Sequence, residues 1–169
     1  MSLIVETGSI VAGADSYISL VDARTMAALY GWALPATDPA AEIALRNGAN
    51  YVGVFESEMK GSRVSVGQSL PYPRKDVNVY GFYLGETEIP TPLKLAQVAA
   101  AVEIGAGLDH RASTDGRVVA SEQVTGAVAV SYFNNGNTGA NVRITKAIDA
   151  LKPLLSSNNN GISFNVARG

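Results

Sequence analysis

Apolar side chains recur at three- and four-residue spacing in several stretches of the chain, which is the pattern of helices that bury one face. The clearest stripe follows Asp38 and Pro39, two residues suited to a helix start. It consists of Ala41, Leu45, Ala49, Val52 and Phe55. Similar patterns predict three more helices, after Ser19, after Ile89-Pro90 and from Thr145 to about Leu155. The chain is therefore expected to form a small bundle of about four helices.

Residues 58–90 break this periodicity and are rich in glycine, serine, proline and aromatic residues, which predicts a long loop. Its stiffest part is Gln68-Ser69-Leu70-Pro71-Tyr72-Pro73-Arg74. Each proline fixes its own φ and holds the preceding residue extended. Leu70, Tyr72 and Arg74 would then alternate along an exposed surface that docks against a partner. In the alternative interpretation, Leu70 and Tyr72 cover the core of the domain itself.

Alternating residues predict a β-hairpin at about 117–132, with Thr125-Gly126 as its turn. Extended arms are expected at both ends, because Leu3-Ile4-Val5 is apolar and Ile162, Phe164 and Val166 alternate with polar residues. Such arms are suited to strand addition onto a neighbouring subunit. The predicted fold class is α+β, mainly α, with one domain over residues 1–155 and an extended C-terminal arm over 156–169.

The composition supports a single folded domain without a membrane span. The chain has 169 residues, of which 47% are hydrophobic, enough for one core. No apolar run approaches the ~20 residues that cross a bilayer. The N-terminus lacks the basic start and long apolar core of a signal peptide, so synthesis and folding in cytoplasm are expected. The formal charge of −2 gives no general attraction to nucleic acid.

Residue types exclude most catalytic chemistry. The chain has no cysteine and one histidine, His110, which rules out thiolate sites and multi-histidine metal sites. His110 lies near Asp109 and Ser113, but no Gly-x-Ser-x-Gly motif marks a nucleophile. Phosphate-binding and dinucleotide-binding motifs are also missing. We therefore predict no catalytic residues, no metal, no cofactor and no enzyme activity.

The loop between the second and third helices is the only candidate for nucleic-acid binding. Its cations are Lys60, Arg63, Arg74 and Lys75, and its rings are Tyr72, Tyr80, Phe82 and Tyr83. Single-strand binders combine a positive groove with stacking rings. Here four carboxylates, Glu58, Asp76, Glu86 and Glu88, balance the four cations. This balance favours rings that pack against protein, and single-stranded-DNA binding stays as the alternative.

Short stretches spread over most of the chain resemble one known family. They are residues 1–8 and 13–17, the helix starts at Asp38 and at Ile89-Pro90, the 68–74 segment, Ser121-Glu122-Gln123-Val124, and Ala167-Arg168-Gly169. They are similar to the head-to-tail connector, or neck adaptor, proteins of tailed bacteriophages. Many of those proteins carry the label DnaT-like single-stranded-DNA-binding protein. The low charge and the aromatic loop at 77–84 depart from the family pattern.

The resemblance implies a structural protein of the virion neck, with no catalytic residues to carry over. About twelve copies would form a ring between the portal protein and a tail protein or second adaptor, and DNA would pass through its bore. The candidate interface with partners or other subunits comprises Leu70, Tyr72, Arg74, Tyr80, Phe82, Tyr83, Ile162, Phe164 and Val166.

Overall fold

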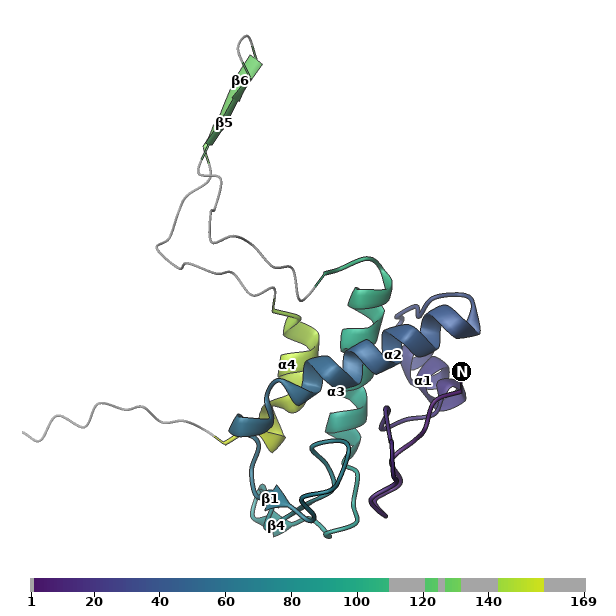
Figure 1. The fold of residues 1–169 in the computed structure, drawn as a ribbon. Helices are drawn as coiled ribbons and strands as arrows, with labels where there is room; N and C mark the ends of the chain where they lie inside the picture. The colour runs from purple at the N-terminus through teal and green to yellow at the C-terminus, as the bar shows by residue number, and fades with distance from the viewer. Residues whose placement is uncertain (1, 110–120, 125–126, 132–142, 157–169) are drawn as a thin grey trace, which may run out of the picture.

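The fold is a bundle of four α-helices, seen here in a computed structural model that describes residues 2–109, 121–124, 127–131 and 143–156. The helices are α1 (Leu20–Leu29), α2 (Asp38–Gly53), α3 (Thr91–Gly105) and α4 (Thr145–Leu151) (Figure 1). Strands β5 (Ser121–Val124) and β6 (Ala127–Ser131) form an antiparallel hairpin within the predicted range. The predicted fold class, mainly α with one β-hairpin, is confirmed.

The segment between α2 and α3 contains short regular elements, whereas the sequence predicts loop throughout. It holds the 3₁₀ turn η1 (Glu56–Glu58) and two small antiparallel pairs. One pair joins β1 (Ser62–Arg63) to β2 (Arg74–Lys75), and the other joins β3 (Asn78–Val79) to β4 (Phe82–Tyr83). Helix α4 ends at Leu151 and is followed by a second 3₁₀ turn, η2 (Lys152–Leu154), which contains Pro153, a residue that disfavours continuation of an α-helix.

The N-terminus of α1 is capped by a side chain, as its sequence predicts, whereas the N-terminus of α2 is not. The Ser19 hydroxyl accepts a hydrogen bond from the amide of Asp22 at 3.1 Å and so caps α1. In α2 the N-cap is Thr37, and its side chain makes no capping hydrogen bond. Asp38 is the first helical residue instead, and its carboxylate lies 2.9 Å from the Arg24 guanidinium.

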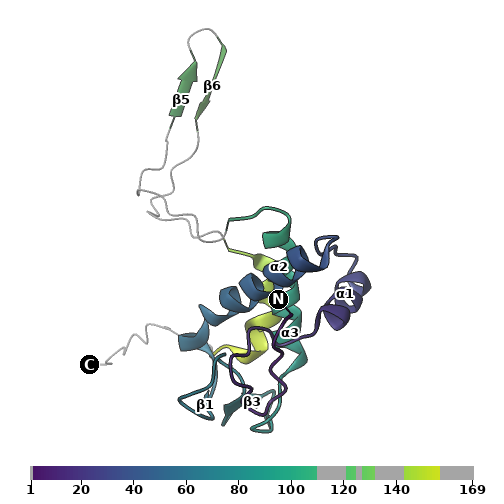
Figure 2. The same cartoon turned by 45° about the vertical axis from the view of Figure 1, so that its right-hand side comes forward.

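Helix α3 is the centre of the molecule and packs against the other three helices (Figure 2). Its fully buried apolar side chains are Leu93, Ala96, Val98, Ala99, Ala100 and Ala101. Gly48 of α2 lies against α3 so closely that a Cβ there would be 2.5 Å from the carbonyl oxygen of Gln97. Small side chains therefore let the two helix backbones approach each other.

A single amide side chain, that of Gln97, joins three parts of the core. It is completely buried. Its Oε1 accepts from the amide of Tyr17 at 2.9 Å, and its Nε2 donates to the Ser16 hydroxyl at 2.8 Å and to the carbonyl oxygen of Leu45 at 2.9 Å. The N-terminal segment, α2 and α3 are thus linked by hydrogen bonds shielded from water, where such bonds are costly to break.

Trp32 fills the space between the end of α1 and α4. Its ring stacks on Tyr30, with centroids 4.9 Å apart and planes at 24°. The ammonium group of Lys146 lies 5.6 Å from the Trp32 ring centroid. Two core clusters meet at this ring, one around α1 and α2 and one around Ile144 and Ala147.

The N-terminal arm and the segment that follows α4 pair with other parts of the same protomer. Val5 forms a parallel bridge with Ser16, and the buried carboxylate of Glu6 accepts from the amides of Gly8, Ile10 and Val11 at 2.8, 3.1 and 2.9 Å. After α4, Leu155 forms an antiparallel bridge with Met59. The C-terminal arm beyond residue 156 lies outside the described residues. In the described part of the chain no helix is long and apolar enough to cross a bilayer.

Candidate docking surface

The proline-rich segment lies inside the protomer and not on its surface. Leu70, Tyr72 and Arg74 are 7%, 1% and 6% exposed, so the predicted display of these three residues to a partner is wrong. The buried amide of Gln68 explains why, because its Nε2 donates to the carbonyl oxygens of Leu70, Pro71 and Pro73 at 2.8, 3.1 and 3.0 Å. The burial agrees with the alternative interpretation, in which Leu70 and Tyr72 cover the core. Burial also raises the pKa of Tyr72 to about 12.

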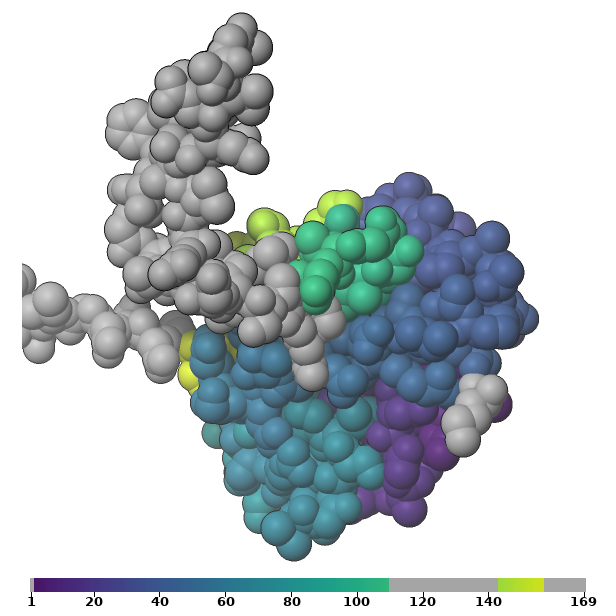
Figure 3. Space-filling view, turned by 45° about the horizontal axis from the view of Figure 1, so that its top comes forward, coloured from purple at the N-terminus to yellow at the C-terminus, as the bar shows by residue number. Residues whose placement is uncertain are grey.

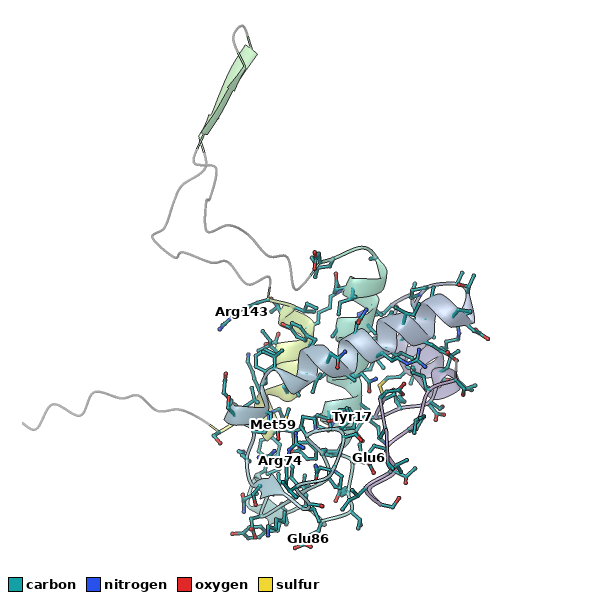
Figure 4. The ribbon with its side chains drawn as sticks, viewed as in Figure 1. Glu6, Tyr17, Met59, Arg74, Glu86 and Arg143 are labelled. Carbon is teal, nitrogen blue, oxygen red and sulfur yellow. The ribbon has the colours of Figure 1, made fainter. Side chains whose placement is uncertain are left out.

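The Arg74 guanidinium binds backbone carbonyl groups and a carboxylate of its own protomer. It donates to the carbonyl oxygens of Lys60 at 2.8 Å and Gly61 at 2.7 Å, and it lies 3.6 Å from a carboxylate oxygen of Glu56. Figure 4 shows Arg74 beside Met59, among the packed side chains of the lower half of the molecule. A cation so enclosed cannot reach a phosphate group or a partner.

Two more of the predicted cations are also engaged within the protomer. The Arg63 guanidinium donates two hydrogen bonds to the Glu56 carboxylate, at 2.5 and 2.7 Å. It also donates to the carbonyl oxygen of Gln68 at 2.8 Å. The Arg63 guanidinium holds the pKa of the Glu56 carboxyl below its usual value. Lys60 donates to the carbonyl oxygen of Pro153 at 2.9 Å. Of the four cations predicted to line a groove, only Lys75 is an exposed side chain.

The exposed feature of this region is the β3–β4 hairpin. Its turn residues, Tyr80 and Gly81, have φ values of 53° and 90°, as a type I′ turn requires. The side chain of Asn78 accepts from the amide of Gly81 at 3.0 Å, and Val77 anchors the base of the hairpin with no exposed surface. A bulky residue at positive φ costs of order 1–3 kcal/mol, and such conformations cluster at functional sites.

Three aromatic rings stand out from this hairpin into solvent. Tyr80, Phe82 and Tyr83 are 82%, 77% and 75% exposed. These three residues are called the aromatic hairpin below. Adjacent exposed rings of this kind mark binding surfaces on soluble proteins. The remaining predicted interface residues, Ile162, Phe164 and Val166, lie outside the described residues.

The flanks of the aromatic hairpin are acidic. Lys75, Asp76, Glu86 and Glu88 are all exposed, which places one ammonium group against three carboxylates and gives residues 75–88 a net charge of −2. Carboxylates beside the rings repel phosphates and attract cationic surfaces. The arrangement therefore suits a protein partner better than a nucleic-acid backbone.

A groove of about 540 Å³ with charged walls lies between the N-terminal segment and the starts of α1 and α3. Glu6, Asp22 and Lys94 line it. The Glu6 oxygens already accept three backbone hydrogen bonds, and Asp22 accepts from the Ser19 hydroxyl at 2.6 Å. No group of three or more potential metal-binding side chains occurs among the described residues.

These features define a class: a small, mainly helical protein that exposes three aromatic rings on a short β-hairpin. Over residues 1–169 the chain matches the family described as "Putative DnaT-like ssDNA binding protein", and it belongs to that family. No characterised protein and no solved structure gave a significant match.

Proposed function

We propose that this protein is a structural subunit of a bacteriophage head-to-tail connector, which acts by binding other protein subunits. The observation that carries the proposal is the contrast within the 58–90 region. Its rings at Tyr80, Phe82 and Tyr83 are exposed, while Lys60, Arg63 and Arg74 are engaged inside the protomer. The family membership is consistent with it, because connector proteins that share the motifs described above often carry the DnaT-like label.

In this proposal the protein forms a homo-oligomeric ring of about twelve copies in the virion neck. One face of the ring contacts the portal protein and the other contacts a tail protein or second adaptor. DNA passes through the bore without sequence-specific contacts. Subunits of such a ring need two different complementary surfaces, because a head-to-tail contact closes only when its rotation closes.

The proposal predicts that the protein is present in purified phage particles in many copies. Quantitative mass spectrometry of intact virions, followed by native mass spectrometry of released necks, measures both its presence and its copy number. A free replication protein packaged by accident would be present at far below one copy per particle. Absence from virions that package DNA normally would reject the connector proposal.

The second candidate is a single-stranded-DNA-binding accessory protein of replication. The description of the family, as DnaT-like and single-stranded-DNA-binding, favours this function more directly than it favours a connector. The exposed aromatic hairpin also offers rings on which bases can stack, at ~1–3 kcal/mol per base. The acidic flanks of the same hairpin oppose it, since a single-strand groove needs cations along the backbone path.

A fluorescence titration separates the two candidates. With a labelled 20-nucleotide single strand, the connector proposal predicts no binding at micromolar protein in 50 mM salt. The replication candidate predicts binding that weakens steeply between 50 and 200 mM salt and that is lost in the double variant Phe82→Ser/Tyr83→Ser. A matched variant of an exposed residue away from the hairpin, Val66→Ser, controls for general surface effects.

A further inference from the structure

The aromatic hairpin needs a partner whose surface is basic or neutral, and the chain itself supplies a candidate. Five of the ten described cations are engaged elsewhere. Arg24 and Arg46 pair with Asp38 and Asp15, and Lys60, Arg63 and Arg74 bind carbonyl oxygens of the protomer. The exposed cations that gather in one place are Arg143, Lys146 and Lys152, at the start of α4, on α4 and at its end.

This α4 face is basic and largely open. Residues 143–152 carry three cations and one carboxylate, Asp149, a net charge of +2. Lys146 pairs with Glu103 of α3 at 2.7 Å and Lys152 pairs with Asp149 at 2.7 Å, so Arg143 is the cation of this face with no ion pair to a described carboxylate, and the local charge is +1 when Glu103 is included. In the space-filling view, α4 lies at the surface beside the end of α3 (Figure 3). Ile148 and Pro153 are only partly covered and add apolar area.

The aromatic hairpin and the Arg143 end of the α4 face lie far apart on one molecule. Figure 4 places Glu86, beside the aromatic hairpin, at the bottom of the helical body and Arg143 at its upper side. Within one protomer the aromatic hairpin therefore cannot contact the start of α4. A contact between unlike surfaces of two copies is heterologous, and its repetition generates a ring or a filament.

We infer that the aromatic hairpin of one copy docks on the α4 face of the next copy. The rings of Phe82 and Tyr83 would supply apolar area, and the carboxylates of Glu86 and Glu88 would face Arg143 and Lys152. The inference rests on the proposed function and deepens it, because it names the two surfaces that join ring subunits. The commitment to a second copy comes from the opposite charges of the two surfaces, −2 for residues 75–88 and +1 for the α4 face with Glu103 included.

A charge-reversal pair tests this contact. Variant one, Glu86→Lys/Glu88→Lys, makes the hairpin basic, and variant two, Arg143→Glu/Lys152→Glu, makes the α4 face acidic. All four positions are exposed, so both variants should keep the wild-type circular dichroism spectrum. Each variant alone should self-associate at least about tenfold more weakly than wild type in sedimentation velocity, because like charges then face each other.

Mixing the two variants should restore assembly. The basic hairpin of variant one then meets the acidic α4 face of variant two, and the acidic hairpin of variant two meets the basic α4 face of variant one. Assembly of either variant at wild-type strength would overturn the inference, as would a mixture that stays monomeric or a wild-type protein that never self-associates. Each of these results leaves the connector proposal standing if the protein is found in virions, whereas absence from virions removes that proposal independently.

Discussion

Replacing Gln97 with leucine should destabilise the protein by about 3 kcal/mol or more. Leucine fills a similar volume but leaves the amide of Tyr17 buried without a partner, and it removes the hydrogen bonds from the side-chain amide to the Ser16 hydroxyl and to the carbonyl oxygen of Leu45. Each buried polar group left unsatisfied costs ~1–3 kcal/mol. Urea unfolding followed by circular dichroism measures the change, and the melting temperature should fall by roughly 6–12 °C for a chain of this size.

An exposed amide on a neighbouring helix provides the control for Gln97. Asn50→Leu replaces the same functional group on α2, where the side chain is exposed. Its effect on the free energy of unfolding should stay within about 0.5 kcal/mol. Equal effects at the two positions would show that Gln97 does not join the N-terminal segment to α2 and α3 in solution.

Replacing Gly48 with alanine should also destabilise the protein, by about 2 kcal/mol, although alanine is the better helix former. The added Cβ would lie 2.5 Å from the carbonyl oxygen of Gln97 and 3.1 Å from the amide nitrogen of Ala101. Both atoms belong to the backbone of α3, so the helices must move apart. Overpacking of this kind costs ~1–3 kcal/mol. Thermal melting and urea unfolding both measure it.

The matched control is Gly53→Ala, in the same helix. There the added Cβ would have its nearest neighbour, a carbon of Pro71, at 3.9 Å, which is an ordinary contact. The gain of up to ~1 kcal/mol in helix propensity should then appear as unchanged or increased stability. If Gly48→Ala also stabilised the protein, α2 and α3 could not be packed as closely as described.

The helices could be predicted because their signals are local. The stripe through Leu45, Ala49 and Val52 and the serine cap at Ser19 need only neighbours in sequence. Gln97 gave no such signal, since it stands within an apolar helix and its partners Tyr17 and Leu45 are 80 and 52 residues away. Periodicity cannot show which polar residue of a buried helix holds distant segments together.

Only part of the candidate docking surface could be predicted from the sequence, because the burial of a loop depends on contacts distant in sequence. An alternating stretch such as 70–74 reads the same whether its side chains face solvent or core, and the three hydrogen bonds of Gln68 decide between the two. The rings at Tyr80, Phe82 and Tyr83 were predicted as interface residues and are exposed. Their hairpin was missed, because a tyrosine at a turn position that needs positive φ is unusual.

Trp32 gives the protein a built-in optical reporter. It is the only tryptophan of the chain, so its emission can be excited selectively and assigned to one place. Its indole is covered by Tyr30 and lies next to Lys146, so any subunit that settles on α4 changes the polarity and quenching around the ring. Stopped-flow emission at 295 nm excitation could then follow the growth of an oligomer in real time, on unlabelled protein.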